Sequence, residues 1–317
     1  MKPFTVTPPD LAAALADLLR RVPGGTVVTF GDLAGAVGAR AAAVWAGTAC
    51  RRPPDEWTED RKNVPTWRAV RATGECVSAE QRDRLIAEGV PFDGDRVVLR
   101  DCRFDGLPSD GPLRELAEEQ AALAERVSLR GERTVDRPIG AVDVAYPSTG
   151  VARAAYVEFE PDGKEPTFRL AVESPISFPY VSGFLAYREL PAYAALVARL
   201  VEANRSPAAL LVDGNGVLHP RRCGVACGLG VRADVPTVGV AKKRLCGTVR
   251  DDGRIELAGE TVGACLANPQ IDNANPVFVS PGHRLSVDAA VRLAAGWFRD
   301  HRLPEPLWHA DRLSKTG

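Results

Sequence analysis

Hydrophobic residues recur along this chain with two different periods. Leu11, Leu15, Leu18 and Leu19 have helical spacing and predict a helix over residues 9–22, which Pro23-Gly24-Gly25 ends. After residue 112, we expect strands at 139–146, 151–159, 168–174, 208–213, 236–242 and 276–282. Helices are expected at 113–128, 189–204 and 221–233 and from Ser286 onward. Strands that alternate with helices predict an α/β fold with a mixed sheet and flanking helices.

One of these predicted strands is apolar throughout. Residues 208–213 read AALLVD, without the alternation of a strand that has one wet face. Such a strand is typical of the centre of a sheet that is covered on both sides.

The first hundred residues have a different pattern. Thr29 precedes FGDLA as a helix cap, Gly38 ends that helix, and a second helix, rich in Ala, is expected over about 39–50. Two short helices joined by a glycine turn suggest a helix-turn-helix, although many small helical domains share that pattern. The segment FDGLPSDGP has the composition of a linker. We therefore expect a mainly helical, winged helix-turn-helix-like domain at 1–105, a linker at 106–112 and an α/β domain at 113–317.

Charge and length change this picture only slightly. No window approaches the ~18 consecutive apolar residues of a membrane span, and the N-terminus has no apolar run, so we expect a cytoplasmic protein that does not enter a membrane. The net charge is −1, so any nucleic-acid contact must come from a local patch. Residues 219–250 contain seven Arg and Lys against one acid, Asp234, which indicates either such a patch or an ordinary solvated face.

The seven cysteines are scattered, and in a chain of 317 residues we expect them to be reduced. Cys223 and Cys227, with His219 just before them, have the spacing of half a zinc site. Because no second pair matches, buried thiols on a helix are the favoured interpretation.

Two aspartates stand out by position. Asp143 interrupts the apolar strand AVDVAY, and Asp213 ends LLVD directly before Gly-Asn-Gly. Either one alone is equally well explained as a strand-end Asp that caps a turn. Together they predict two carboxylates that meet at one sheet edge, with Glu189 as a third oxygen ligand. Oxygen ligands select hard cations, so Mg²⁺, or Mn²⁺, is the expected cofactor.

Two further residues follow predicted strands and are candidates for the same site. His283 is expected in a loop after residues 276–282, and Lys242 ends VAK. An imidazole there can orient or deprotonate an attacking water, and an ammonium can neutralise charge on a phosphate. A lone histidine is more often structural. The glycines of DGNG permit close backbone approach by a ligand.

Five segments of the α/β region resemble the endonuclease V family, in family order and spacing: IGAVDVAY, FPYVSGFLAYRELPA, LLVDGNGVLHPRR, PTVGVAK and PVFVSPGHR. The resemblance covers residues 112–315. It implies an RNase H-like fold and Mg²⁺-dependent nicking of DNA at deaminated purines, hypoxanthine above all, at the second phosphodiester bond 3′ to the lesion. It also implies that Asp143, Glu189 and Asp213 form the metal cluster, with His283 as the catalytic histidine and Lys242 as the catalytic lysine.

The same resemblance assigns residues that contact the substrate. Pro179, Tyr180, Val181 and Ser182 match a strand-separating wedge, and Gly183, Gly214 and His219 match the lesion pocket. An aromatic wedge can replace the stacking lost when a base leaves the duplex. The chain departs from the family at Ser182, where proline is usual, at Asn215, where His or Gln is frequent, and at Cys227-Gly228, where a more polar pair is usual.

The first ~105 residues resemble the DNA-binding domain of alkylguanine-DNA alkyltransferases, and more closely the alkyltransferase-like proteins, through VPGGTVVTFGDLA, VPTWRAVRATGE and QRDRLIAEGVPFDGDRVVL. The reactive Pro-Cys-His-Arg motif of that family reads Pro65-Thr66-Trp67-Arg68 here. Because alkyl transfer needs a thiolate, we predict none. Phe30 replaces the DNA-binding tyrosine of the family, and its arginine finger is either displaced to Arg40 or lost.

These observations leave three functions open. The first is a repair endonuclease with a fused recognition domain. The second is a non-catalytic sensor of damaged bases that recruits other repair factors, and the third is an inosine-specific endoribonuclease. In each case the partner is nucleic acid. For the repair endonuclease, the partner is single- or double-stranded DNA that contains deaminated bases.

Overall fold

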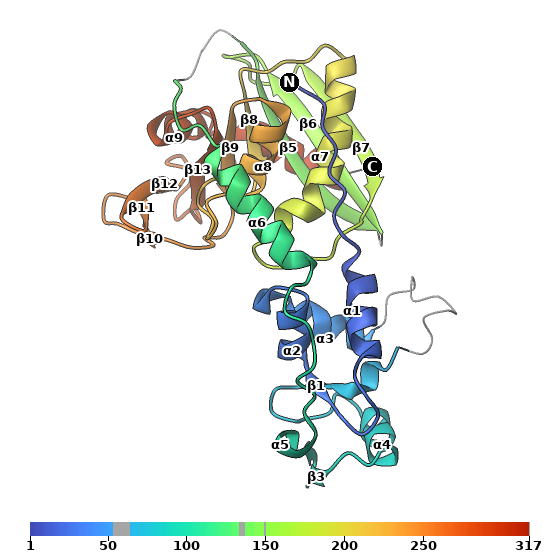
Figure 1. Cartoon of the computed structure of the whole chain (residues 1–317). Coiled ribbons are helices and arrows are strands. Elements are labelled where there is room, and N and C mark those ends of the chain that lie inside the picture. Colours follow the sequence, from blue (N-terminus) through green and yellow to red (C-terminus); the bar gives the residue numbers. More distant parts are fainter. Residues whose placement is uncertain (53–63, 133–136, 149, 317) are drawn as a thin grey trace. The chain divides into compact units, whose positions relative to one another are not determined.

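The computed structural model of the protein describes residues 1–52, 64–132, 137–148 and 150–316. They form two compact units. The sheet unit contains Met1–Pro8, Glu119–Ser177 and Leu185–Gly317, and the helical unit contains Pro9–Glu118 together with Phe178–Phe184. In Figure 1 most of the helical unit is blue to cyan, and the strands of the sheet unit run from green to orange-red.

The sheet unit is built on a nine-stranded mixed sheet in the order β10-β11-β12-β13-β9-β8-β5-β6-β7. Its strands are β5 (Ile139–Ser148), β6 (Val151–Phe159), β7 (Phe168–Pro175), β8 (Ala209–Asp213), β9 (Thr237–Ala241), β10 (Thr248–Val249), β11 (Arg254–Leu257), β12 (Glu260–Leu266) and β13 (Val277–His283). An antiparallel meander, β5-β6-β7, is followed by β8 and β9, which run parallel to β5. This confirms the predicted mixed α/β sheet with RNase H-like topology.

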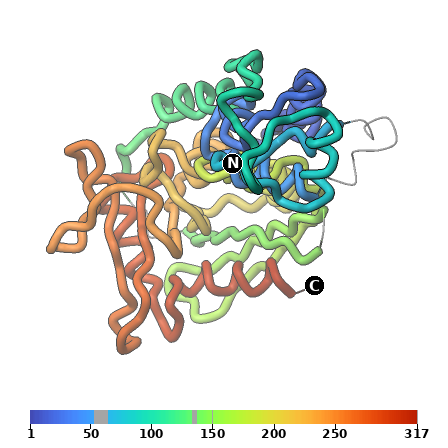
Figure 2. The backbone as a smooth tube through the Cα atoms, turned by 90° about the horizontal axis from the view of Figure 1, so that it is seen from below, coloured from blue at the N-terminus to red at the C-terminus, as the bar shows by residue number. Residues whose placement is uncertain are grey.

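Alternating side chains of the strands bury two faces of this sheet. Ile139, Ala141 and Leu211 face a core covered by α9 (Val287–Ala295) and α10 (Glu305–Lys315). Val142, Leu210 and Val212 face the opposite core, under α7 (Leu185–Glu202) and α8 (Val225–Ala233). In Figure 2 the red C-terminal helix lies along the green strands on one side of the sheet.

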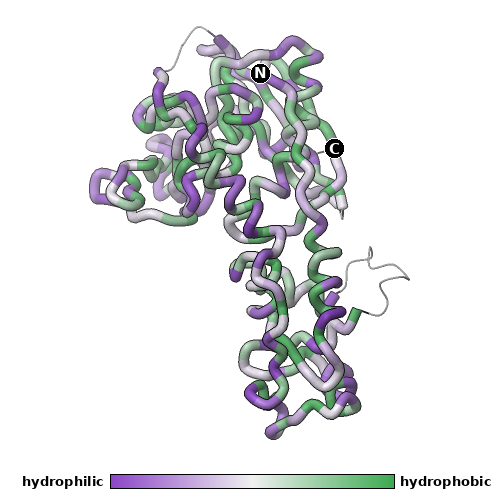
Figure 3. Tube along the Cα trace, in the orientation of Figure 1, coloured by the Kyte–Doolittle hydropathy of each residue, from purple (hydrophilic) through white to green (hydrophobic). Residues whose placement is uncertain are grey.

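Strand β8 lies between β5 and β9, and its residues 209–212 are buried, which confirms the central position predicted from AALLVD. The two helix–sheet cores make the inner part of the unit hydrophobic, whereas the outlying hairpin β10–β11 is largely polar (Figure 3).

The helical unit contains short helices and two small strand pairs, β1 (Val28–Thr29) with β2 (Ala69–Val70) and β3 (Phe92–Asp93) with β4 (Arg96–Val97). Its helices are α1 (Leu11–Arg20), α2 (Phe30–Ala36), α3 (Ala43–Arg51), α4 (Ala79–Ala87) and α5 (Leu99–Cys102), with α6 (Pro112–Glu125) continuing into the sheet unit. Short 3₁₀ turns lie at Arg40–Ala42 and Thr66–Arg68.

The predicted helix start at Thr29 is confirmed, with a complete capping box. The Thr29 side chain accepts from the Asp32 N–H, and the Asp32 carboxylate accepts from the Thr29 N–H. Gly38 forms the turn between α2 and α3 at a φ of 102°. A Cβ there would lie 2.5 Å from the Arg114 nitrogen, so only glycine fits.

Several elements differ from the sequence prediction. Strand β13 continues through His283, which therefore lies within the sheet and not in a following loop. Helix α8 begins at Val225, four residues later than expected, and α7 begins at Leu185, four residues earlier. Strands β10 to β12 and helix α10 had no counterpart in the prediction.

Candidate active site

Three aspartates from separate elements meet at one edge of the sheet. Strand pairing places Val142 beside Val212, so Asp143 and Asp213 follow in register on neighbouring parallel strands. Helix α10 packs against β5 and adds Asp311. One carboxylate oxygen from each aspartate lies within 4.8 Å of the other two.

Asp311 was missing from the sequence prediction, although a signal for it exists. Leu307, Ala310 and Ser314 form the buried face of α10 at helical spacing. Asp311 lies four residues after Leu307, at the border of this face. A carboxylate in that position is normally paired or bound to a cation.

Glu189 lies beside the same cluster on α7. It is 7% exposed, and its Oε2 has no hydrogen-bond partner among the residues that the structure describes. One helical turn later the hydroxyl of Tyr193, also fully buried, has no such partner either. Two orphaned polar atoms beside three aspartates indicate a site that is completed by a bound species.

The electrostatics of the cluster agree with that interpretation. Burial, and then the neighbouring carboxylate of Asp213, raise the pKa of Asp143 to about 7. Burial and the carboxylates of Asp213 and Asp143 raise the pKa of Glu189 well above its usual value. Acidic groups that repel one another in this way are stabilised by a divalent cation.

Two lysines partly compensate the negative charge. Lys242 Nζ lies 2.5 Å from Asp213 Oδ2 and 2.6 Å from Asp311 Oδ1. Lys315 Nζ lies 2.6 Å from Asp311 Oδ2. Although burial works in the other direction, these two ammonium groups lower the pKa of Asp311.

A cavity of about 400 Å³ opens beside the cluster. Its walls include the three aspartates, both lysines and the segment 144–147. Tyr146 in this wall is 38% exposed, and the guanidinium of Arg188 lies 4.3 Å from its ring centre. A cavity of this size, with charged side chains and an aromatic ring in its walls, has room for a phosphate and part of a nucleotide.

The donor set fits a hard divalent cation. All candidate ligands are carboxylate oxygens, and both lysines keep their ammonium groups next to a ligand. Asp143, Asp213 and Asp311 are placed to hold such an ion directly, with Glu189 close enough to act through it or through its waters.

The structure does not bring His283 to this site, so that expectation was wrong. Strand β13 runs antiparallel to β9 and pairs His283 with Thr237, at the start of β9, whereas Lys242 follows its end. Five residues of strand separate the two positions by ~16 Å. The His283 Nδ1 accepts from the Ser128 N–H, and the charges that act on its pKa come from Arg284, Asp234 and Arg126.

The loop after β8 is held by close backbone contacts. A Cβ on Gly214 would lie 2.3 Å from Val225 Cγ1, and one on Gly216 would lie 2.1 Å from the Pro281 carbonyl. These glycines therefore allow close packing within the protein itself. His219 is buried and its Nδ1 accepts from the Arg221 N–H, while the buried Asn215 Oδ1 has no partner within the described ranges.

The predicted wedge is a loop between β7 and α7. Phe178, Val181 and Phe184 are buried, and Tyr180 is 64% exposed. Gly183, at a φ of 79°, forms a turn that the Phe184 N–H closes by donating to the Val181 carbonyl at 2.9 Å. Pro179 is partly buried and Ser182 is exposed. The anchored loop thus presents an aromatic ring to solvent.

The basic segment 219–250 is less free than its sequence suggests. Four of its cations pair with carboxylates: Arg222 with Glu260, Arg232 with Glu119, Lys242 with Asp213 and Arg250 with Glu256. Cys223 and Cys227 are both buried as free thiols.

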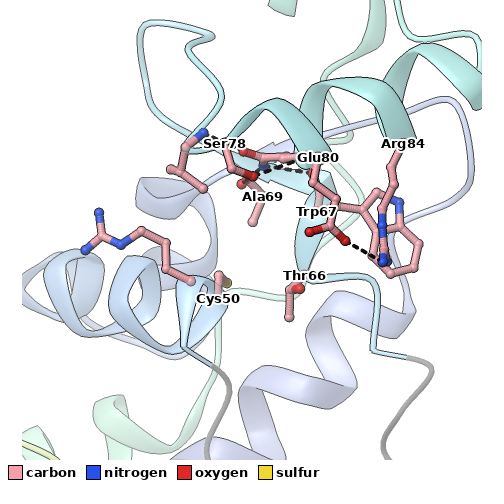
Figure 4. A pocket seen from close by; sticks show the side chains of 10 residues that line it. Cys50, Thr66, Trp67, Ala69, Ser78, Glu80 and Arg84 are labelled. Atoms are coloured by element: carbon pink, nitrogen blue, oxygen red, sulfur yellow. Dashed lines mark hydrogen bonds and ion pairs between the residues drawn. The ribbon is translucent and has the colours of Figure 1, made fainter.

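The helical unit has a separate cavity, of about 330 Å³, at the altered Pro65-Thr66-Trp67-Arg68 motif (Figure 4). Thr66, Trp67 and Cys50 line it, and Arg84 stacks on Trp67 at 4.9 Å. Trp67 Nε1 and Arg68 both donate to Glu88, and the first of these bonds fixes the Trp67 ring in the cavity wall. Burial raises the pKa of the Cys50 thiol to about 12, so this cavity contains no thiolate at neutral pH.

An RNase H-like sheet with clustered carboxylates at its edge defines a class of protein, the metal-dependent nucleases that hydrolyse phosphodiester bonds. Within the described residues, no helix combines the length and apolar character that a membrane crossing requires. Residues 121–312 match the family model described as endonuclease V, and residues 10–90 match the one described as the DNA-binding domain of 6-O-methylguanine DNA methyltransferase.

Similar proteins support both parts of the chain. A bifunctional methyltransferase/endonuclease of Picrophilus torridus is 31% identical over 92% of each chain. Endonuclease V of Azotobacter vinelandii is 39% identical over 67% of this chain and 95% of its own. The structure of Ciona intestinalis endonuclease V with DNA that contains an inosine has a TM-score of 0.58 and 26% identity, over 65% of this chain and 97% of that one. The chain belongs to the endonuclease V family, fused to an N-terminal alkyltransferase-like DNA-binding domain.

Proposed function

We propose that this nuclease nicks DNA at deaminated purines, hypoxanthine above all, and cuts the second phosphodiester bond 3′ to the lesion. The observation that carries the proposal is the cluster of Asp143, Asp213 and Asp311, whose oxygens lie within 4.8 Å of one another beside an open cavity.

The aspartates are proposed as ligands of Mg²⁺, with Mn²⁺ as a substitute. A bound divalent cation supplies an activated water and stabilises the leaving oxygen in phosphodiester hydrolysis. Asp143 and Asp213 would hold the cation from neighbouring strands, and Asp311 would hold it from α10. Glu189 is assigned to the ligand waters, because its carboxylate lies beside the cluster and its buried Oε2 has no hydrogen-bond partner among the described residues.

Lys242 is assigned to the phosphate. It contacts two of the three aspartates and lines the cavity, so its ammonium lies where negative charge develops on a scissile phosphate. His283 is given no part in the reaction.

Recognition of the lesion is assigned to the two loops that the family resemblance indicates. Tyr180 is exposed on a loop anchored by buried neighbours, which suits a ring that stacks in place of an extruded base. Gly214 and His219 match the lesion pocket of the family, and between them the buried Asn215 Oδ1 has no hydrogen-bond partner among the described residues. That the Ciona relative binds inosine-containing DNA supports this substrate.

The helical unit is proposed to bind DNA without accepting an alkyl group. Thr66 occupies the nucleophile position, and the only cysteine that lines the cavity among the described residues is Cys50, whose thiol stays protonated. In this proposal the helical unit contributes DNA binding alone, and all of the chemistry takes place in the sheet unit.

A nicking assay on the intact chain tests this function. DNA with one inosine should be nicked with Mg²⁺ and left intact with EDTA, and Asp143→Ala and Asp213→Ala should each abolish nicking. Asp251→Ala, which removes an exposed carboxylate of the β10–β11 turn, is the matched control and should nick normally.

The same assay separates the competing functions. A sensor would bind inosine-containing DNA without cutting it, and an endoribonuclease would cut an inosine-containing RNA in preference to the matching DNA. Full nicking by Asp213→Ala protein would refute the metal assignment.

A further inference from the structure

Helix α10 turns three polar side chains toward the carboxylate site. Asp311, Ser314 and Lys315 have i, i+3 and i+4 spacing and therefore share one side of the helix. Asp311 and Lys315 are paired at the cavity wall. Ser314 lies deeper, fully buried, and its hydroxyl donates to Oδ2 of Asp143.

We propose that Ser314 is a positioning residue for cation binding, which holds the Asp143 carboxylate so that its other oxygen faces the ion shared with Asp213 and Asp311. This inference rests on the proposed role of Asp143 as a ligand. It gives the C-terminal helix two functions at the site, because the helix supplies one ligand and orients another.

The local geometry of α10 supports this role. A serine within a helix usually donates back to a carbonyl of the preceding turn, and the Asp311 carbonyl lies 2.9 Å from the Ser314 Oγ. A hydroxyl has one proton and donates to one acceptor at a time. A carboxylate that binds a cation is ionised, and a bond to it is the stronger of the two, so in the cation-bound protein the hydroxyl favours Asp143.

The surroundings of Asp143 make this hydroxyl distinctive. Asp143 is 4% exposed, and the charged groups that act on it include the carboxylates of Asp213 and Glu189 and the ammonium of Lys242. Lys242 bonds to Asp213 and Asp311 instead. Ser314 is therefore the neutral donor that fixes the orientation of the most buried ligand, and such outer-shell donors typically change metal affinity 10–100-fold.

Titration calorimetry of the full-length protein with Mn²⁺ tests the inference directly. Ser314→Ala should weaken Mn²⁺ binding by about 10-fold, and Ser314→Thr, which keeps the hydroxyl, should restore it. Thr316→Ala is the matched control, because Thr316 is an exposed hydroxyl of the same helix end that donates to the Arg312 carbonyl. It should bind Mn²⁺ as the wild type does.

Folding of each variant is checked by circular dichroism, and if Ser314→Ala fails to fold, Ser314→Cys takes its place as a poor donor of similar volume. Unchanged Mn²⁺ affinity in the donor-poor variant overturns the inference, as does an equal loss in Thr316→Ala or a failure of the threonine to restore binding.

Asp143→Ala, measured alongside, separates this inference from the proposed function. If Asp143→Ala binds Mn²⁺ as tightly as the wild type, the metal assignment itself fails. If Asp143→Ala loses binding while the Ser314 variants keep it, the positioning role alone fails.

Discussion

Replacing Asp143 with Asn should abolish nicking and at the same time stabilise the metal-free protein above neutral pH. Burial and the Asp213 carboxylate raise the pKa of Asp143 from its ordinary value of 3.8 to about 7. The folded protein therefore holds a proton that the unfolded chain releases between pH 4 and pH 7, so stability falls as the pH rises through that window. Three pH units at ~1.4 kcal/mol each set an upper limit of about 4 kcal/mol. Asn has the same shape, carries no charge and still accepts from Ser314.

Urea unfolding in EDTA at pH 5 and pH 8, followed by circular dichroism, measures this effect. The variant should be more stable than the wild type at pH 8, and the difference in unfolding free energy should be larger there than at pH 5. Added Mn²⁺ should stabilise the wild type and leave the variant unchanged. Asp251→Asn serves as the control for a surface carboxylate. If the difference between Asp143→Asn and wild type fails to grow with pH, the electrostatic account of the site is wrong.

Three more predictions follow from the site and the two cavities. Asp311→Ala removes a proposed direct ligand and should reduce nicking of inosine-containing DNA by at least about 100-fold, beyond the 10–100-fold loss typical of an outer-shell partner. His283→Ala should reduce nicking by less than about 10-fold. The reverse order in single-turnover assays would restore the histidine to the site. Tyr180→Ala should weaken binding of an inosine duplex by the ~1–3 kcal/mol of one lost stacking contact, with a smaller effect on a single strand, as measured by fluorescence anisotropy; equal losses on both substrates would argue against a wedge. Thr66→Cys should still accept no methyl group from O6-methylguanine DNA, because Trp67 cannot activate the thiol as histidine would; a methylated peptide in the mass spectrum would show otherwise.

The fold was predictable where the side-chain pattern was strong. The apolar run at 208–213 identified the central strand, and the Thr29 cap identified the start of α2. The small strands β10 to β12 were not predicted, because two to seven residues with exposed, charged positions lack a clear period. Helix α10 was overlooked because Pro304 and Pro306 at its start resemble a loop, although proline is tolerated in a first helical turn.

The site was predictable for residues on strands that run parallel to one another. It was not predictable for residues on an antiparallel strand or on the C-terminal helix. Asp143 and Asp213 were expected to meet because a carboxylate inside one apolar strand and another at the end of a second can come together when the strands are neighbours. The same reasoning misplaced His283, because the end of a strand reaches this site only if the strand is parallel to β9, and β13 is antiparallel. A strand that runs in the opposite direction ends at the opposite edge of the sheet, and the local sequence of β13 does not reveal its direction. Asp311 lies far from the motifs in sequence and enters the site only through packing of α10.

The eight residues before the helical unit belong to the sheet unit. Met1, Phe4 and Val6 pack against the core beneath α7 and α8, and the Lys2 N–H donates to the Ala233 carbonyl at 2.7 Å. Residues 9–118 therefore form a loop closed by the folded nuclease, at a chain-entropy cost on the order of 4 kcal/mol for a loop of this length. During synthesis the first segment cannot form its contacts with α7 and α8 until more than two hundred further residues have been made. Deleting these eight residues should therefore lower the stability of the sheet unit and leave the stability of the helical unit unchanged.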